Sequence, residues 1–503
     1  MPAKIFSAAL VGVEAALVAV EADAGGGDFG QIAIVGLPDA AVSEAKERVK
    51  SALRNCGLEF PRRKITVNLA PADLKKHGPA YDLPIAVSIL ALKNNFRADF
   101  KNSLLAGELA LDGEVRPIAG ALPLALAAKN KGLKNFFLPE KNAAEAKLIK
   151  DLTVFPVRNL KQLLNYWRGK EIIRPQATAR EKKERPNASF NWPDIKGQAK
   201  AKRALVLAAA GGHNLLLFGP PGAGKTILAK SLAGLLPPLS FPERLEITKI
   251  YSVAGLLKNQ NCLIGARPFR SPHHGSSATA LTGGGAWPRP GEISLAHRGV
   301  LFLDELPEFP RTVLENLRQP LEDGEISVNR AAFSSRFPAK FILVAAMNPC
   351  PCGYWGDKDK ICRCQPGQIA NYRRRLSGPL MDRFDLYAEV PRLKAEELTA
   401  PANEDLVALK AGVLKAREEQ KRRFKNSPFL VNAEMPNALV NNFCSLDKAG
   451  QSLLKAAVEK LNLSARAYFR VLKLARTIAD LEAAEDIKIG HLAEALQYRS
   501  RLE

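Results

Sequence analysis

Residues 215–226 read Leu-Leu-Leu-Phe-Gly-Pro-Pro-Gly-Ala-Gly-Lys-Thr, and this stretch decides the fold of the middle of the chain. Four apolar residues of buried-strand type lead directly into a glycine-rich loop, and apolar residues at helical spacing follow it. A strand, a loop of this composition and a helix in this order form the phosphate-binding unit of nucleotide-binding α/β proteins. The sequence therefore predicts a nucleoside triphosphate site on a sheet of parallel strands.

The loop residues have distinct expected roles. Glycines let backbone N–H groups close around phosphates at the start of a helix, where unpaired N–H groups favour negative charge. We expect Lys225 to contact the β- and γ-phosphates and the Thr226 hydroxyl to bind Mg²⁺. The predicted nucleotide-binding residues of the loop are Gly219, Pro220, Pro221, Gly222, Ala223, Gly224, Lys225 and Thr226.

Two further strands are expected to end beside this loop. Residues 299–305 form an apolar run that ends in two adjacent carboxylates, and ligands of open α/β sheets bind at such strand ends. Asp304 is predicted to bind nucleotide through Mg²⁺, and Glu305 to orient and deprotonate the attacking water. The apolar run 341–346 leads to Asn348, which is expected to hydrogen-bond the γ-phosphate or the water.

Charge and composition restrict the partners of the chain. Across 503 residues, 73 Lys and Arg stand against 51 Asp and Glu, for a formal net charge of +22. Such a charge attracts polyanions over long range, and nucleic acid is the first partner to consider, although a plain basic surface gives the same count. No stretch is long and apolar enough to span a bilayer, so no membrane partner is expected. The seven cysteines are not spaced as a secreted disulfide framework, which predicts a reducing cytoplasm.

The periodicity of apolar residues predicts three domains and a linker. Residues 1–165 alternate strand and helix patterns, beginning with a strand from Val11, a turn at residues 25–28 and a second strand to Val35. Residues 166–190 are polar and charged and are predicted to be a linker. An α/β nucleotide-binding core is expected over 191–391, and a helical lid over 392–503.

Four cysteines crowd into one short segment of the core. They form two Cys-x-Cys pairs, at Cys350 and Cys352 and at Cys362 and Cys364. Four thiolates in a reduced protein suit a tetrahedral Zn²⁺ site, and the alternative is a set of inert reduced thiols. We expect a structural zinc clip beside the nucleotide site.

Beyond these motifs the chain resembles a known family, the YifB/ComM group of magnesium-chelatase-like AAA+ ATPases. The resemblance rests on residues 219–226, 267–274 with the glycines at 283–285, 291–305, 348–353, 377–385 and 464–481. It implies a Mg²⁺- and ATP-dependent homo-oligomeric ring, hexameric in the family. Asn348 resembles the sensor 1 residue, Arg383 the arginine finger and Arg466 the sensor 2 residue. Whether Arg466 serves its own subunit's nucleotide or a neighbour's stays open. By composition alone, both Arg383 and Arg466 also suit an ordinary salt bridge.

The same resemblance points to DNA contacts. Residues 267–285 look like the insert, and residues 325–336 like the hairpin, that this group directs into the ring pore. The candidate DNA-binding residues are His273, His274, Arg330 and Arg336. For the two histidines, ordinary loop packing is the alternative.

The N-terminal domain resembles the Lon protease domain, an S5-like α/β fold. Where that protease has Gly-Pro-Ser, this chain has Gly78-Pro79-Ala80, and Leu122 lies near the expected lysine. A serine–lysine dyad needs a hydroxyl nucleophile and an amine base, so proteolytic inactivity is predicted. The catalytic set expected for the whole chain is therefore Glu305, Asn348, Arg383 and Arg466.

The expected function is an ATPase ring that binds and translocates on single-stranded or branched DNA. By resemblance to ComM-type proteins, it would be a branch-migration helicase in recombination or natural transformation. A protein-remodelling or chelatase-like AAA+ motor is the alternative.

Overall fold

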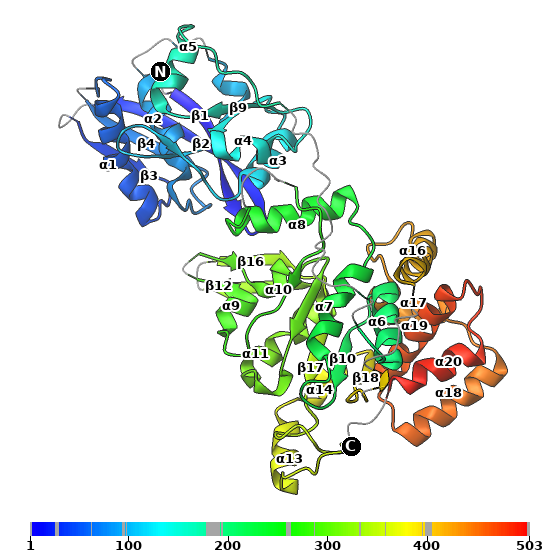
Figure 1. The fold of residues 1–503 in the computed structure, drawn as a ribbon. Helices are drawn as coiled ribbons and strands as arrows, with labels where there is room; N and C mark the ends of the chain where they lie inside the picture. Colours follow the sequence, from blue (N-terminus) through cyan, green and yellow to red (C-terminus); the bar gives the residue numbers. More distant parts are fainter. Residues whose placement is uncertain are drawn as a thin grey trace.

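The chain folds into three successive regions (Figure 1). The computed structural model describes residues 3–25, 30–61, 63–92, 96, 98–177, 192, 195–257, 263–285, 287–330, 333–357, 359–394, 396–397 and 405–499, without the side chains of Asn329, Arg330 and Phe333. Most of the predicted linker, from residue 178 to 190, lies outside these ranges.

The N-terminal region is a seven-stranded mixed sheet with helices on both faces. Its strands run in the order β3-β4-β2-β1-β5-β8-β9, and β2 is antiparallel to both of its neighbours. One core cluster joins α1, α2 and α5 to the sheet, and the other joins α3 and α4. The elements are β1 Ala3–Val11, β2 Glu14–Gly25, β3 Ile32–Val35, α1 Ala40–Asn55, β4 Lys64–Ala70, η1 Pro79–Tyr81, α2 Asp82–Ala91, η2 Phe100–Asn102, β5 Ser103–Leu105, β6 Glu108–Leu109, β7 Val115–Arg116, α3 Ala121–Asn130, β8 Asn135–Pro139, α4 Glu140–Ala146, β9 Thr153–Val157 and α5 Leu160–Trp167.

The start of this region differs from the sequence prediction. Val11 ends a first strand, β1, and the second strand begins at Glu14 after a tight turn at Gly12. Alternate residues of the two strands, such as Ile5 and Val20, are fully buried and pair across the sheet. Because the run alternates weakly between apolar and polar residues, its division into a hairpin was not evident from the pattern. The turn was predicted at residues 25–28, and residues 26–28 of it lie outside the described residues.

The middle region has the predicted parallel sheet at its centre. Five strands run in the order β11-β14-β17-β10-β18, all parallel, so that β10 lies between β17 and β18. The elements are α6 Ala199–Gly211, β10 Leu215–Phe218, α7 Lys225–Leu235, α8 Phe241–Val253, β11 Phe269–Arg270, α9 Ala278–Thr282, β12 Gly283–Gly284, β13 Arg289–Pro290, α10 Glu292–Leu295, β14 Val300–Leu303, η4 Leu306–Glu308, α11 Arg311–Asn316, α12 Arg318–Asp323, β15 Glu325–Arg330, β16 Phe333–Pro338, β17 Ile342–Met347, α13 Pro366–Arg374, α14 Gly378–Met381 and β18 Leu386–Glu389.

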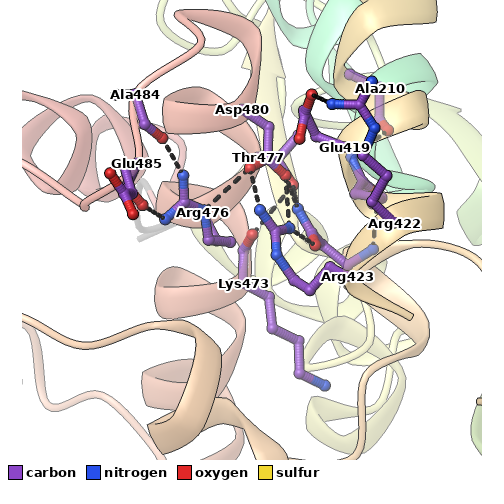
Figure 2. A network of polar contacts seen from close by, with 12 residues as sticks. Ala210, Glu419, Arg422, Arg423, Lys473, Arg476, Thr477, Asp480, Ala484 and Glu485 are labelled. Carbon is purple, nitrogen blue, oxygen red and sulfur yellow. Dashed lines mark hydrogen bonds and ion pairs between the residues drawn. The ribbon is translucent and has the colours of Figure 1, made fainter. Parts of the chain in front are cut away.

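The C-terminal region is the predicted set of helices, and it packs against α6 of the core. Its elements are α16 Leu406–Arg423, η5 Asn432–Glu434, α17 Asn437–Phe443, α18 Lys448–Leu461, α19 Ala465–Leu481 and α20 Ile489–Gln497. Figure 2 shows the polar network that joins α16 to α19. At its centre the carboxylate of Asp480, 1% exposed, accepts hydrogen bonds from Arg423 at 2.6 and 2.8 Å and from Arg476 at 3.0 Å. Buried charges satisfied in this way fix the helices at a defined angle.

Helix α8 joins the N-terminal region to the core. The amide of Gly120 donates to the carbonyl of Ser252 at 3.0 Å, and Lys249 pairs with Glu14 at 2.6 Å. On the other side of the contact, His77 stacks on Trp287 of the core with ring centroids 4.4 Å apart. None of the described helices is long and apolar enough to cross a membrane.

Candidate nucleotide-hydrolysing site

The glycine-rich loop lies where the sequence predicts, between the end of β10 and the start of α7. Gly222 and Gly224 have φ angles of 76° and 90°, a backbone region that favours glycine. A Cβ on Gly219 would lie 2.1 Å from the carbonyl oxygen of Val390, so a side chain there would collide with the backbone after β18. The loop conformation therefore depends on glycine at these positions.

Lys225 points back into this loop. Its ammonium donates to the carbonyls of Gly219 at 2.6 Å and Pro220 at 2.9 Å, and to Asn348 Oδ1 at 3.0 Å. Burial lowers the pKa of Lys225 to about 8, while the nearby carboxylates of Asp304 and Glu305 act in the opposite direction. Lys225 and Asn348, which are far apart in sequence, thus meet at the loop, where both could contact a γ-phosphate.

A pair of oxygen ligands suited to Mg²⁺ lies where α7 begins and β14 ends. The Thr226 hydroxyl donates to Asp304 Oδ2 at 2.8 Å, and the other carboxylate oxygen accepts from the Glu305 amide at 3.0 Å. Mg²⁺ in such sites is held by one or two protein oxygens together with phosphates and water. The hydroxyl and the carboxylate fit that role, and Mg²⁺ binding by this pair stays a prediction.

Glu305 stands at the mouth of the site in an unusual backbone conformation. Its φ is 53°, and its side chain is 55% exposed. His274 Nδ1 lies 3.4 Å from Glu305 Oε2, and the two neighbouring imidazoles of His273 and His274 are 4.0 Å apart. The loop after β11 thus carries His274 to the predicted catalytic carboxylate, because β11 and β14 are adjacent strands.

The two predicted arginines lie at the opposite edge of the sheet. Arg383 precedes β18, and Arg466 begins α19, and both guanidinium groups contact the carboxylate of Glu322. The Arg383 side chain is only 2% exposed, whereas that of Arg466 is 55% exposed. Burial lowers the pKa of Arg383, Glu322 opposes this, and the charge of Arg466 adds to the lowering. The Arg383 guanidinium is therefore enclosed by α12 and α14 in this conformation, and its role as an arginine finger stays a prediction.

A basic cavity of about 570 Å³ opens beside these arginines, between the sheet edge and the lid. Asp385 there is fully enclosed; burial acts to raise its pKa, but Arg470 and His213 lower it below its ordinary value. One turn further along α19, burial lowers the pKa of Lys473 to about 8. In Figure 2 the Lys473 side chain points away from the buried network of the lid.

Comparison with known proteins places this site in a family. Residues 191–398 match the family described as magnesium chelatase, subunit ChlI; residues 403–499 match the C-terminal part of that subunit, and residues 20–142 match a further description of ChlI. The competence protein ComM of Haemophilus influenzae is 45% identical over 505 residues, covering 99% of this chain and 97% of that protein. This chain belongs to the YifB/ComM family of magnesium-chelatase-like AAA+ ATPases.

Other relatives show the range of that family. A protein of Salmonella typhimurium named YifB is 44% identical over 500 residues, covering 99% of this chain and 96% of its own length. The magnesium-chelatase 38 kDa subunit of Cereibacter sphaeroides is 30% identical over 176 residues, which is 32% of this chain and 53% of that protein. The chain is an AAA+ ATPase of the YifB/ComM type, and it brings Asn348 and Asp304 to the loop; their roles in ATP hydrolysis stay predictions.

The four cysteines form one cluster next to the ATP site. Their Sγ atoms all lie within 4.8 Å of one another, and three of the separations are 3.4, 3.6 and 3.7 Å. Tetrahedral thiolates at Zn²⁺ are about 3.8 Å apart for a Zn–S bond of about 2.3 Å, so the set fits the ion. The cluster also touches the ATP loop, because a Cβ on Gly353 would lie 2.5 Å from Pro221 Cδ.

The hairpin that resembles a pore element is present as β15 and β16. Arg336 on β16 is exposed and pairs with Glu325 at 3.3 Å, while the Arg330 side chain lies outside the described residues. The turn at Gly12 of the N-terminal region packs on this hairpin. A Cβ added to Gly12 would lie 3.0 Å from the carbonyl oxygen of Arg336. DNA contact by these arginines stays a prediction.

In the N-terminal region, the two positions compared with the Lon dyad carry neither a hydroxyl nucleophile nor an amine base. Ala80 lies in η1, with its carbonyl accepting from the Gly107 amide at 2.9 Å, and Leu122 is fully buried in α3. Proteolytic inactivity and the likeness to Lon both stay predictions from the sequence.

Sequence reasoning missed Glu322 and the contact between His274 and Glu305. Glu322 lies near the end of α12 without any motif around it, so no local signal marks it. His274 belongs to a quoted motif, but its contact depends on the pairing of β11 with β14, which the sequence does not show.

Proposed function

We propose that this AAA+ ATPase assembles into a hexameric ring that translocates on DNA and drives branch migration. The main support for ring assembly is the position of Arg383 and Arg466. The ATP loop follows the C-terminal end of β10, whereas Arg383 precedes the N-terminal end of the neighbouring parallel strand β18. A strand of this length spans about 13 Å, so the arginines face away from the loop of their own chain.

A neighbouring copy would bring its nucleotide to these arginines. A head-to-tail contact repeated around an axis closes into a ring, and a guanidinium from outside the ATP loop stabilises charge on the transferring phosphoryl group. Glu322 holds the buried guanidinium of Arg383 and the exposed guanidinium of Arg466 at one place, which favours their joint action on one nucleotide. Within each ATP site, Glu305 would position the water and Asn348 the γ-phosphate.

Charge supports DNA as the polymer that the ring acts on. The net charge of +22 suits a polyanion, and the exposed Arg336 lies on the hairpin expected at the pore. The name of the Haemophilus influenzae relative, a competence protein, fits a role in natural transformation and recombination.

The alternative is a protein-remodelling or chelatase-like motor, favoured by the similarity to the magnesium-chelatase subunit. That similarity covers 32% of this chain, whereas the likeness to ComM covers 99%. We therefore place DNA translocation first.

We also propose that the four cysteines hold one structural Zn²⁺. The ion would fasten the segment after Asn348 and, through Gly353, keep Pro221 and the ATP loop in place. It takes no part in hydrolysis.

The deciding experiment is steady-state ATP hydrolysis with no DNA, single-stranded DNA, duplex DNA or a four-way junction, each at two salt concentrations. A DNA motor is stimulated most by the branched substrate, and the stimulation weakens with salt. The Glu305→Gln protein is the control for contaminating ATPases. A rate indifferent to every DNA would reject DNA translocation and favour the chelatase-like motor. Light scattering with a non-hydrolysable ATP analogue tests the ring, and a single-chain mass would contradict it.

A further inference from the structure

The cysteine cluster is part of a larger projection, residues 350–375, which we call the cysteine module. It begins directly after β17 and Asn348 and ends with α13, and it extends away from the rest of the core (Figure 1). Its base is fixed by the contact of Gly353 with Pro221 and by the buried ring of Tyr372. The far side of the module faces solvent, which leaves it available to a partner.

An aromatic side chain is exposed on this projection. Trp355 is 40% exposed, and the guanidinium of Arg373 lies over its ring at 4.3 Å from the centroid. A second pair of the same kind brings the Lys360 ammonium 5.0 Å from the ring of Tyr354. Cations held over aromatic rings keep the rings oriented and add positive charge beside them.

The charge around these rings is mainly positive. Lys360, Arg363 and Arg374 are exposed on the module. The carboxylate of Asp357 is used within the loop, where it accepts hydrogen bonds from the amides of Asp359 at 2.8 Å and Lys360 at 3.0 Å. The module therefore combines an exposed indole with cations that can contact phosphates.

We propose that the cysteine module binds single-stranded DNA by stacking an unpaired base on Trp355, with Lys360, Arg363 and Arg374 contacting the backbone phosphates. Bases of a duplex are already stacked, so an exposed indole can add stacking only where bases are unpaired. The inference rests on the proposed action on DNA and adds a contact outside the pore hairpin.

The test uses the full chain and a fluorescently labelled oligothymidylate. Trp355→Ala should weaken binding by about fivefold or more, since stacking on an aromatic side chain is worth about 1–3 kcal/mol per base. Trp355→Phe keeps an aromatic face and should recover part of that loss. The triple variant Lys360→Gln, Arg363→Gln, Arg374→Gln should weaken binding and reduce its salt dependence.

A matched control removes the same charge elsewhere. Lys415→Gln, Lys421→Gln, Lys425→Gln changes three exposed residues in and beside α16 of the lid and should leave oligothymidylate affinity nearly unchanged. Tryptophan fluorescence gives a second readout. Of the other three tryptophans, Trp167 and Trp192 are only 3% and 2% exposed, and Trp287 is half-buried and stacked on His77. Quenching by oligothymidylate in the parent protein should be largely lost in Trp355→Phe.

The outcomes separate this inference from the proposed function. If DNA stimulates ATP hydrolysis but every module variant binds oligothymidylate like the parent, the module is not a DNA contact and the translocase proposal stands. If the parent binds no single-stranded DNA and no DNA stimulates it, both proposals fail. Loss of binding in Trp355→Ala with partial recovery in Trp355→Phe supports the proposed DNA contact of the module. If the variants were merely misfolded, their affinity for oligothymidylate would not follow the size of the aromatic side chain at position 355.

Discussion

Arg383 and Arg466 bind the same carboxylate, that of Glu322, although one precedes the last strand of the core and the other begins a lid helix. The shared contact ties the lid to the edge of the sheet that lies opposite the ATP loop. The pair is separated from the chain's own ATP loop by the length of the sheet strands, which is the basis for the proposal that these arginines serve a neighbouring copy.

Mixing of defective subunits tests this arrangement. Arg383→Ala and Lys225→Ala should each lower ATP turnover by about 10³-fold, the range seen for arginine fingers. In randomly mixed rings about a quarter of the contacts join an intact ATP loop to an intact arginine, so turnover should return well above that of either variant. Mixing Lys225→Ala with Glu305→Gln, which damage the same half of the site, should restore nothing. A mixture no more active than its components would place Arg383 on its own subunit's nucleotide.

The contact of His274 with Glu305 predicts a role in hydrolysis. His274→Ala should lower kcat about tenfold with little change in the affinity for ATP, because it removes the group beside the catalytic carboxylate. The measurement is a comparison of kcat with ATP affinity, with His273→Ala as the neighbouring control. Weakened DNA binding at unchanged basal kcat would instead favour the DNA contact predicted from the sequence.

Zinc content tests the cysteine cluster. The purified protein should carry about one zinc ion per chain, and Cys364→Ser should lower the metal affinity at least tenfold. Loss of the ion should also raise the KM for ATP, because Gly353 would no longer hold Pro221. Cys444→Ser, a buried cysteine of the lid, is the control and should retain the metal. A parent protein free of zinc after purification without chelators would show that the thiols are inert.

The burial of Lys473 predicts a pH-dependent effect on stability. The pKa of Lys473 is about 8 in the folded chain, against an ordinary value of 10.5. Between pH 8 and pH 10.5 the unfolded chain therefore binds more protons than the folded chain. Folding becomes more favourable as the pH rises through this range. Lys473→Met should therefore stabilise the protein by about 2 kcal/mol at pH 7, a figure reduced for partial exposure. The gain should shrink towards pH 10.5. Thermal unfolding midpoints at pH 7 and pH 10 give the comparison, with the exposed Lys448→Met as control; an equal gain at both pH values would contradict it.

Much of the ATP site could be predicted because its signals are local. The strand, loop and helix around Gly219–Thr226 are contiguous, and each acidic or amide side chain ends an apolar strand of its own. Parallel strands present their C-terminal ends at one edge, so the meeting of Lys225, Asp304 and Asn348 follows from strand type alone. The first hairpin was less predictable, since Gly12 interrupts a run whose alternation is weak.

The sequence was enough to predict an ATP loop with Mg²⁺ ligands, a catalytic carboxylate and a four-cysteine cluster, because each of these is a short pattern with its own chemistry. Tertiary structure alone decided that Arg383 and Arg466 share Glu322, that His274 reaches Glu305, and that Gly353 supports Pro221. Those contacts depend on the order of strands in the sheet and on the packing of the lid, which bring together residues that no local pattern connects.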